Sequence, residues 1–531
     1  MTHLTIPIAA KNPDEAKLQI EAALTAGAEM LELRTDYLEN LDVDLVKHLI
    51  AEVKSAAKKP VPIIVTCRDV REGGAIDYPL KLRMDVLIAA IKTGAAYIDF
   101  EYENFLVPEN RGRIRVALSQ SLKGKLILST HNFTTKFENI GALRRRITTL
   151  YPAAIPKIVY TANHINDCFD AFDLLHKTSG ERIVFCMGQA GLISRVIVKK
   201  LDGFATFASI DSETATAPGQ LTVEQFKKLY RYDSINADTE LYGVIGSPIA
   251  HSLSPAIHNA AFADIDANKL YLPLLVEGGT AEFEQFMRNI ANRPWLGFKG
   301  FSVTIPHKEN ALNYVIQKEG TIEPLAKRIG AVNTVLINKN GKLAAYNTDY
   351  AGAMDAILAG MDITRGDLRN VSAAVIGAGG VARAVVAGLA DAHAKITIYN
   401  RTVKRGEALA ADFDCDFATL DELSRVEADL LINCTSIGMH PNINETPISK
   451  EYLKANMTIF DTIYNPAETF LLKQAKELGC KTISGMDMFF NQALLQFKLF
   501  TGQDANPDLV RKSVIEGLWD KDTRADSADS V

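Results

Sequence analysis

A histidine at the end of an apolar segment is the first residue of this chain that could do chemistry. Residues 126–133 read Leu-Ile-Leu-Ser-Thr-His-Asn-Phe, and the aliphatic start is typical of a strand buried on both faces. His131 follows where that strand ends, in a run of polar residues. A lone histidine in such a place is more often an ordinary loop residue than an acid–base group. Its function therefore depends on the side chains that the fold brings to it.

A lysine lies inside a second apolar segment, Ile-Pro-Lys-Ile-Val-Tyr-Thr at 155–161. A buried ammonium is costly unless it is paired or gives up its proton. Lys157 could be a lysine that reaches solvent at a strand edge. Alternatively, it is a desolvated amine that attacks a ketone to form a Schiff base. His131 could then move protons, and Glu101 could fix the orientation of its ring.

These side chains would meet if the strands that carry them form one closed sheet. Up to about residue 235, apolar runs alternate with amphipathic segments that end on glycine. The runs are 4–10, 29–36, 62–69, 96–103, 125–132, 156–162, 182–188 and 204–211. Their number and spacing predict a (β/α)₈ barrel, with a doubly wound open sheet as the alternative.

In a barrel, the carboxyl ends of all the strands meet at one mouth, where chemistry should collect. Polar residues do recur at these ends. They are Glu32, Arg34, Asp36, Arg68, the Arg-Glu-Gly-Gly sequence at 71–74, Asp99, Glu101, Glu103, His131, Lys157, Ser194, Arg195 and Gln220. Arg68 and Arg195 would suit a substrate carboxylate through forked hydrogen bonds.

The ordered motifs of this half resemble those of type I 3-dehydroquinate dehydratases. The motifs are "ELRTDYL", "TCRDVREGG", "DFEYE", "LSTHNF", "PKIVYT", "MGQAGLISRV" and "TAPGQ", and the resemblance covers about residues 1–230. In that family a lysine forms an imine with the C3 ketone of the substrate. A histidine removes a C2 proton and delivers a proton to the departing C1 hydroxyl.

The resemblance implies that Lys157 forms the imine and that His131 is the general acid and base, supported by Glu101. It also implies that the substrate is bound by Glu32, Arg34, Arg68, Arg195, Thr216 and Gln220. Thr216 stands where many relatives have serine, so a hydroxyl is retained.

The second half begins after a polar stretch at 231–240 and contains a nucleotide-binding pattern. Residues 371–388 run from an apolar strand through Gly377-Ala378-Gly379-Gly380 into an Ala/Val-rich helix, as in pyrophosphate-binding turns. The next strand, 394–400, ends at Asn400 and is followed by Arg401, Thr402, Lys404 and Arg405. This stretch has no acidic residue to accept from a ribose hydroxyl. These cations suit a 2′-phosphate and predict NADP(H), although a solvated basic turn is the alternative.

Lys308 and Asp349 precede this unit and could transfer a proton during reduction of a carbonyl. Lys308 follows a Pro-His turn, and we expect Asp349 in a polar loop. A surface ion pair is the alternative interpretation, since most Lys and Asp residues have that fate.

The motifs of the second half resemble those of shikimate dehydrogenases from about residue 241 to 515. They are "GSPIAHSLSPAIHN", "GFSVTIPHKE", "IGAVNTV", "YNTDYAG", "INCTSIGM", "DTIYNP" and "GMDMFFNQALLQF". The resemblance implies catalysis by Lys308 and Asp349. It implies substrate binding by Ser252, Ser254, Thr304, Asn333, Tyr464 and Gln492. Ser302 replaces an asparagine of many bacterial relatives, which bears on how the substrate carboxylate is oriented.

Together the resemblances imply an α/β chain of four parts. We expect a barrel at 1–232, a substrate-binding domain at 240–351 completed by 486–519, a Rossmann NADP-binding domain at 352–485, and a disordered tail at 520–531. The first half would convert 3-dehydroquinate to 3-dehydroshikimate, and the second would reduce that product to shikimate with NADPH. The product of the first reaction is thus the substrate of the second.

Composition agrees with an ordinary soluble enzyme. The 531 residues are 47% hydrophobic and 23% charged, and the net charge of −6 excludes a general affinity for nucleic acid or anionic membranes. Six scattered cysteines form no zinc or redox motif, which predicts no metal and a reducing, cytoplasmic location. No apolar stretch has membrane-spanning length, and the strand-like start at His3 predicts no leader peptide. The chain could be a monomer or a homodimer.

Three other functions are open at this point. The chain could bind metabolites of the pathway without turnover, although Lys157, His131, Lys308 and Asp349 are all present. The second half could prefer quinate, against which the retained Ser and Thr hydroxyls argue. The barrel could be only a structural partner of an active dehydrogenase.

Overall fold

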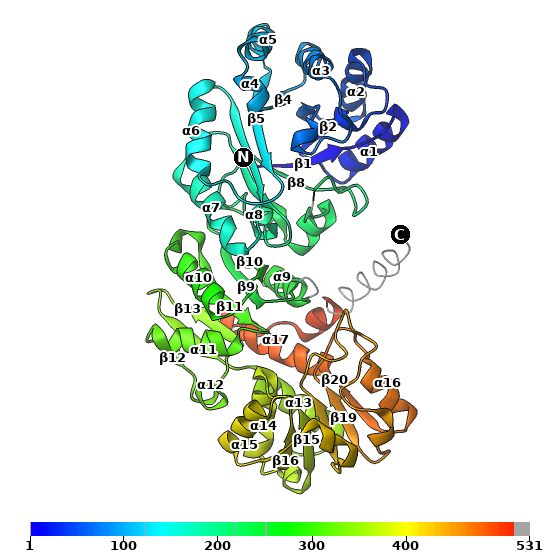
Figure 1. The fold of residues 1–531 in the computed structure, drawn as a ribbon, viewed down its shortest axis with the longest axis vertical. Helices are drawn as coiled ribbons and strands as arrows, with labels where there is room; N and C mark the ends of the chain where they lie inside the picture. Colours follow the sequence, from blue (N-terminus) through cyan, green and yellow to red (C-terminus); the bar gives the residue numbers. More distant parts are fainter. Residues whose placement is uncertain (1, 122, 218, 250–251, 514–531) are drawn as a thin grey trace. The chain divides into compact units, whose positions relative to one another are not determined.

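The computed structural model describes residues 2–121, 123–217, 219–249 and 252–513 and forms two compact units (Figure 1). The boundary between the units lies at Thr239 and Glu240. The tail expected at 520–531 lies outside the described residues.

The first unit is an eight-stranded parallel sheet in the order β7-β6-β5-β4-β3-β2-β1-β8. Its strands are β1 (His3–Ile8), β2 (Met30–Arg34), β3 (Ile63–Thr66), β4 (Tyr97–Glu101), β5 (Lys125–Asn132), β6 (Ile155–Thr161), β7 (Ile183–Met187) and β8 (Ala205–Phe207). β1 pairs with both β2 and β8, so the sheet curls round on itself. At the remaining seam the backbone N–H of Phe204 donates to Arg182 O at 2.8 Å, which nearly closes the barrel.

Helices alternate with these strands, as the sequence predicts. They are α1 (Pro13–Thr25), α2 (Val43–Ala56), α3 (Leu80–Thr93), α4 (Tyr102–Leu106), α5 (Pro108–Ser119), α6 (Ile140–Leu150), α7 (Cys168–Lys177) and α8 (Leu192–Val196). Three starts are fixed by side-chain caps, because Asn12, Asp42 and Asn139 each accept from a backbone N–H three residues on. The prediction of a barrel is confirmed, and the alternative of an open sheet is wrong.

The interior of the barrel is filled by apolar side chains from most of its strands. Met30, Ile64, Ile127, Ile155 and Ile183 belong to one fully buried cluster. Alternating strand positions point inward, so the next inward residues along each strand reach the carboxyl-end mouth. The packed core therefore holds the polar residues of the mouth on a rigid frame.

The second unit begins with a mixed six-stranded sheet in the order β10-β9-β11-β13-β14-β12. Its strands are β9 (Glu240–Gly246), β10 (Lys269–Leu275), β11 (Phe298–Val303), β12 (Thr321–Ile322), β13 (Thr334–Ile337) and β14 (Leu343–Tyr346). Four helices lie between them in sequence: α9 (Ser254–Asp264), α10 (Thr280–Ala291), α11 (Lys308–Gln317) and α12 (Pro324–Ile329).

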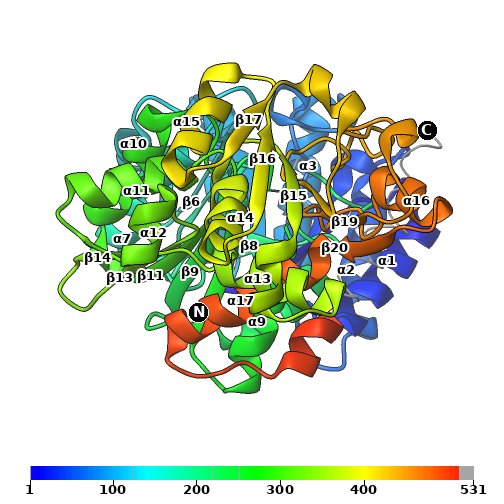
Figure 2. The ribbon, with the colours of Figure 1, turned by 90° about the horizontal axis from the view of Figure 1, so that it is seen from below.

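A second six-stranded sheet follows, in the order β17-β16-β15-β18-β19-β20, and all its pairings are parallel. Its strands are β15 (Ser372–Ile376), β16 (Lys395–Tyr399), β17 (Asp416–Ala418), β18 (Leu430–Asn433), β19 (Thr458–Asp461) and β20 (Lys481–Ser484). The helices are α13 (Asp349–Met361), α14 (Gly380–Asp391), α15 (Val403–Phe413) and α16 (Phe470–Glu477). In Figure 2, α14 lies over β15 and β16, while α16 flanks β19 and β20. This is the doubly wound sheet of a Rossmann domain.

The chain then returns to the mixed sheet through α17 (Gly485–Thr501). Phe497 and Phe500 pack near His258 of α9, and Phe500 O accepts from the Tyr242 hydroxyl of β9. Helix α17 therefore completes the domain built on the mixed sheet, which starts at Glu240.

Candidate active sites

Lys157 lies in the interior of β6 and is 4% exposed. Its Nζ donates to Asp99 Oδ2 at 2.8 Å and lies 3.5 Å from Glu32 Oε1. The Phe207 ring, 4.5 Å from Nζ, covers another side of the amine. Pairing with acids thus replaces the water that this cation has lost.

Arg68, just after β3, holds together two acids of β4 and a serine of β5. Its guanidinium contacts Asp99 Oδ2 at 2.8 Å and Glu101 Oε1 at 3.2 Å, and it donates to Ser129 Oγ at 2.5 Å. Burial alone would lower the pKa of Arg68, but the charges of Asp99 and Glu101 outweigh it and raise that pKa. Arg68 is therefore a fixed cation in the floor of the site.

His131 is oriented by Glu72, and the expectation that Glu101 orients it is wrong. Glu72 Oε2 lies 3.0 Å from His131 Nδ1 and accepts from the His131 backbone N–H at 3.1 Å. Glu101 instead accepts from Arg68, from Arg83 of α3 and from Asn104 of α4. The cause is a tight turn, Val70–Glu72, which folds Glu72 back over the mouth of the barrel.

The surroundings of Glu72 and His131 favour the neutral form of each side chain. Burial raises the pKa of Glu72 to about 8, against the charge of Arg68. Burial also lowers the pKa of His131 well below its ordinary value, and the charges of Arg68 and Lys157 add to this effect. Each shift favours the neutral form, so the imidazole can act as a base.

Arg195 is a buried cation without an ionic partner in the described part of the chain. It is 1% exposed, its Nε and Nη2 have no hydrogen-bond partner there, and its guanidinium lies 4.7 Å from the centre of the Phe185 ring. Burial lowers the pKa of Arg195 to about 10. The side-chain nitrogen of Gln220 likewise has no partner among these residues, while its oxygen accepts from Thr216. These unused donors suit an incoming carboxylate.

One cavity of about 60 Å³ joins these groups at the mouth of the barrel. Its wall includes the predicted residues Glu32, Arg34, Arg68, His131, Lys157, Arg195, Thr216 and Gln220. Glu101 is absent from this wall, and Glu72 is part of it. Arg34 is partly engaged, because its guanidinium donates to both oxygens of Asp36.

Lys308 and Asp349 meet in the second unit. Lys308 begins α11, and its Nζ donates to Asp349 Oδ2 at 2.5 Å. Asp349 is the first residue of α13, so the expectation that it lies in a polar loop is wrong. Its other oxygen accepts from Asn333 Nδ2 at 2.9 Å. Both ends of the carboxylate are therefore fixed, and a surface ion pair is ruled out because Lys308 and Asp349 are buried.

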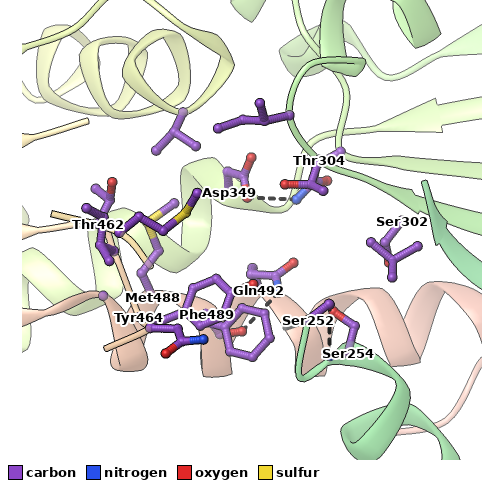
Figure 3. A pocket seen from close by; sticks show the side chains of 18 of the residues that line it. Ser252, Ser254, Ser302, Thr304, Asp349, Thr462, Tyr464, Met488, Phe489 and Gln492 are labelled. Carbon is purple, nitrogen blue, oxygen red and sulfur yellow. Dashed lines mark hydrogen bonds between the residues drawn. The ribbon is translucent and has the colours of Figure 1, made fainter. Parts of the chain in front are cut away.

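A cavity of about 200 Å³ opens beside this pair (Figure 3). All six residues expected to bind the substrate contribute to its wall: Ser252, Ser254, Thr304, Asn333, Tyr464 and Gln492. Figure 3 shows Tyr464 lying against Phe489, and their rings stack with centres 4.1 Å apart. The wall combines hydroxyls and amides on one side with apolar side chains on the other, as in many sites for small polar molecules.

Ser302 lies in the wall of this cavity, and its hydroxyl makes two hydrogen bonds to other side chains. Its Oγ accepts from the Tyr271 hydroxyl at 2.6 Å and donates to Gln496 Oε1 at 2.7 Å. Gln496 Nε2 in turn donates to Asn333 O at 3.2 Å. A chain of hydrogen bonds thus links Ser302 to Asn333, which holds Asp349.

The glycine turn after β15 is shaped to hold a nucleotide. Gly377 has φ +114°, and a Cβ there would lie 3.0 Å from Cys434 O, so a side chain would not fit. A Cβ on Gly379 would meet no atom within 4 Å, which leaves open space above the N-terminus of α14. Gly380 faces Lys308, whose side chain a Cβ would approach to 2.9 Å. The open end of α14 beside Ala378 fits a pyrophosphate.

The basic turn after β16 is exposed, as a 2′-phosphate site requires. Arg401, Thr402 and Lys404 lie at the surface, and Asn400 Nδ2 donates to Thr402 O. Arg405 is engaged by Glu309 of α11, with 3.1 Å between Nη2 and Oε1.

Comparison with known proteins agrees with this architecture. The family model for type I 3-dehydroquinase matches residues 4–237. Models for the shikimate dehydrogenase substrate-binding domain, for shikimate/quinate 5-dehydrogenase and for the shikimate 5′-dehydrogenase C-terminal domain match residues 244–335, 359–467 and 485–515. A bifunctional 3-dehydroquinate dehydratase/shikimate dehydrogenase of Arabidopsis thaliana is 36% identical over 526 residues, which cover 95% of this chain and 82% of the relative.

The chain belongs to the bifunctional 3-dehydroquinate dehydratase/shikimate dehydrogenase family.

Proteins with a single activity resemble the second half of this family member. A shikimate dehydrogenase (NADP⁺) of Methanosarcina acetivorans is 41% identical over 288 residues, which cover 52% of this chain and 98% of the relative. A solved shikimate 5-dehydrogenase of Thermus thermophilus, in complex with NADP(H) and shikimate, is 32% identical. It covers 52% of this chain and 100% of its own, with a TM-score of 0.46.

Sequence reasoning missed four residues that this family member uses to build its two sites: Glu72, Asp99, Tyr271 and Gln496. Glu72 lies in the quoted Arg-Glu-Gly-Gly sequence, so the glycines that follow it were a usable signal for a tight turn. Asp99 was noted only as one of several acids at a strand end. Gln496 lies in the quoted motif at 485–497, whereas Tyr271 lies in an ordinary strand pattern that carries no signal.

The described part of the chain contains no helix long and apolar enough to cross a membrane. Among the same residues, no group of three or more His, Cys, Asp or Glu side chains is arranged to hold a metal ion.

Proposed function

We propose that the chain dehydrates 3-dehydroquinate to 3-dehydroshikimate in the barrel and reduces 3-dehydroshikimate to shikimate with NADPH in the second unit. One observation carries this proposal. Each unit holds a buried lysine at the wall of its own cavity, and the Nζ of that lysine contacts an aspartate. A lysine buried in a cleft beside a charge partner is typical of nucleophiles and proton donors.

In the barrel, Lys157 attacks the C3 ketone, and His131 removes the C2 proton. Glu72 holds the imidazole through Nδ1, so that Nε2 is left for the substrate. His131 then returns a proton to the C1 hydroxyl as it leaves. The partnerless guanidinium nitrogens of Arg195 support its role as the carboxylate-binding residue. Glu32, Arg34, Arg68, Thr216 and Gln220 complete the substrate site.

In the second unit, Lys308 and Asp349 hold and move the proton that the carbonyl oxygen gains. Asp349 is fixed by Asn333 and begins α13. Its contact with Lys308 holds the lysine amine beside the cavity. Ser252, Ser254, Thr304, Asn333, Tyr464 and Gln492 would bind the carboxylate and hydroxyls of the substrate.

The residues around the glycine turn fit NADPH, which supplies the hydride when bound. Gly377, Ala378, Gly379 and Gly380 would cradle the pyrophosphate. Asn400, Arg401, Thr402, Lys404 and Arg405 would bind the 2′-phosphate, and the lack of an acid at this strand end supports NADPH over NADH.

The experiment that tests the proposal uses the whole chain. Purified protein is mixed with 3-dehydroquinate and NADPH, and NADPH absorbance is followed while products are identified by chromatography. We expect steady loss of NADPH with shikimate as the product. No loss with 3-dehydroquinate but loss with 3-dehydroshikimate would contradict the barrel activity alone. No loss with either substrate would favour a protein that binds pathway metabolites without turnover.

Domain limits, assembly and location are part of the same proposal. We place the barrel at 1–232, the substrate-binding domain at 240–351 with 486–519, and the NADP-binding domain at 352–485. We propose a monomer or homodimer, which light scattering would test. A cytoplasmic location is supported by the six cysteines, all of which are free thiols.

A further inference from the structure

Asp99 of β4 is the most deeply buried acid that contacts a candidate reacting atom. It is 0% exposed, and its Oδ2 accepts from Lys157 Nζ at 2.8 Å and from Arg68 Nη2 at 2.8 Å. Its Oδ1 accepts from Ser129 Oγ at 2.6 Å. Both oxygens are therefore held in place by neighbouring strands, with one of them directed at the lysine amine.

The charge of this carboxylate is secured by its surroundings. Burial would raise the pKa of Asp99, but the charges of Arg68 and Lys157 outweigh it and hold that pKa well below its ordinary value. The surroundings of Asp99 therefore favour its ionised form. Its charge remains when the amine beside it is converted to another group.

Imine formation keeps a positive charge at the same nitrogen. The ammonium and the ketone together give a protonated imine and one water, so the proton count on the reacting groups is unchanged when the imine is protonated. The carbon–nitrogen double bond replaces the carbon–oxygen double bond, and the ketone oxygen leaves in the water. Only the protonated imine withdraws electrons strongly enough to assist removal of the C2 proton.

We propose that Asp99 is a catalytic residue of the barrel, the counter-ion that keeps the imine on Lys157 protonated. The inference rests on the proposed dehydration and adds a residue to it. Fixed charges near a reacting centre stabilise developing charge without reorganisation, which is the advantage of an anion held from both sides.

Glu32 is the competing candidate for this role, and the geometry disfavours it. Its Oε1 lies 3.5 Å from Lys157 Nζ and accepts from Thr66 Oγ1 at 2.7 Å. Glu32 also lines the cavity, where it can meet the substrate, whereas Asp99 does not. Arg34, Arg68, His131 and Glu72 line the same cavity as the amine, and the one acid among these four, Glu72, pairs with His131.

The test compares two buried aspartates, one that contacts Lys157 and one that does not. Asp99→Asn removes the anion beside Lys157. Asp69→Asn removes an anion from the same network, where Asp69 accepts from Arg71, Arg83 and Asn104 and makes no contact with Lys157. Dehydration is measured by the absorbance of the conjugated product from pH 5.5 to 9.5. The imine is trapped with borohydride in the presence of 3-dehydroquinate and detected by mass spectrometry.

We expect Asp99→Asn to lower kcat at least about a hundredfold while KM changes by less than about threefold. Its kcat profile should move to lower pH by about one unit or more, because more acid is needed to protonate the imine. Borohydride trapping should move to lower pH in the same way. Asp69→Asn should retain the wild-type profile.

Two results would overturn the inference: an Asp99→Asn profile that matches that of Asp69→Asn, or a loss of kcat without any shift along the pH axis. If Asp99→Asn does not fold, as judged by circular dichroism, Ser129→Ala decides instead. Loss of the Ser129 hydroxyl should shift the profile in the same direction by a smaller amount, and an unshifted profile refutes the role of Asp99. Failure of the wild-type protein to give any trapped adduct would contradict the proposed dehydration itself.

Discussion

The two units contain the same pair of residues, a buried lysine and an aspartate, in different settings. Lys157 lies in the middle of a strand, with Asp99 at 2.8 Å and a second acid, Glu32, at 3.5 Å. Lys308 and Asp349 instead each begin a helix and meet at 2.5 Å. The lysine in the strand is enclosed by a barrel, whereas the lysine at the helix start faces a glycine turn.

This difference explains how one ion pair can serve two kinds of chemistry. The barrel places His131, the proposed base, on the strand beside that of Lys157, and this arrangement suits the proposed covalent intermediate. The second unit gives Lys308 no histidine contact among its described residues but places it beside Gly380, where a nucleotide would bind. The surroundings of a lysine, more than its partner, thus decide whether it acts as a nucleophile or as a proton donor.

Replacing Lys157 should cause the largest loss of activity, and the loss should be confined to the barrel. Lys157→Ala removes the nucleophile, so dehydration should fall at least about a thousandfold. Oxidation of shikimate with NADP⁺ should stay within about twofold, since that site lies in the other unit. Lys125→Ala, at an exposed lysine that begins β5, is the matched control and should change neither rate. Loss of both activities in Lys157→Ala would contradict two independent sites.

The reciprocal change replaces the lysine of the pair formed by Lys308 and Asp349. Lys308→Met retains the length of the side chain but removes the proton donor, so 3-dehydroshikimate reduction should fall by about a hundredfold to ten-thousandfold. Dehydration should remain unchanged. Lys327→Met, at an exposed lysine of α12, serves as the control. A fall of less than about tenfold in Lys308→Met would mean that the lysine only positions the substrate.

Glu72→Gln tests a feature that distinguishes the barrel, the contact between Glu72 and His131. No such pair occurs among the described residues of the second unit. Burial raises the pKa of Glu72 to about 8, so ionisation near that pH should make His131 a stronger base and increase the wild-type rate. Glutamine cannot ionise, so the variant should lose this rise and about tenfold to a hundredfold in kcat at pH 8.5. Glu103→Gln, at an exposed acid of α4, should keep the wild-type profile.

The same variant makes a prediction about stability. Folded wild-type protein keeps the Glu72 proton up to about pH 8, whereas the unfolded chain loses it near the ordinary value of 4.5. The folded state thus binds more protons in this window, and this contribution to stability is lost as the pH rises through it. Glu72→Gln should therefore become more stable relative to the wild type between pH 5 and 8.5. Urea unfolding of the two proteins, at both pH values, would detect this trend or its absence.

The smallest expected effect concerns the cofactor. Arg401→Ala should raise KM for NADPH about tenfold and leave KM for NADH nearly unchanged, because only NADPH carries the 2′-phosphate. Arg369→Ala is the control, since Arg369 is an exposed cation of the same domain that contacts Gly366 O. Equal effects on the two cofactors would contradict the assignment of the basic turn.

Much of the fold followed from local patterns in the sequence. Each strand of the barrel is a short apolar run, and β6 is buried over six of its seven positions, so the run itself was the signal that predicted it. The glycine turn after β15 was predictable for a similar reason, because its geometry depends on residues next to one another. The residues of both candidate sites lie at the ends of such elements.

Contacts between distant side chains could not be predicted in this way. Glu72 follows β3 and Glu101 is the last residue of β4, and only the backbone turn that ends at Gly73 (φ +85°) directs Glu72 toward His131. Glu101 instead accepts a hydrogen bond from Arg83, a residue of α3 that belongs to none of the sequence motifs. Similarly, Tyr271 reaches Ser302 across β9, which depends on strand order and register.

The return of the chain through α17 has a consequence for protein synthesis. The barrel is one continuous stretch, so it can fold as soon as it leaves the ribosome. The pocket of the second unit needs Gln492 and Gln496, which are made more than a hundred residues after Ser302 and Asn333. Translation that stops before residue 485 would thus release a chain with a complete barrel and an unfinished dehydrogenase. The order of the two activities along the chain is also the order in which a nascent polypeptide acquires them.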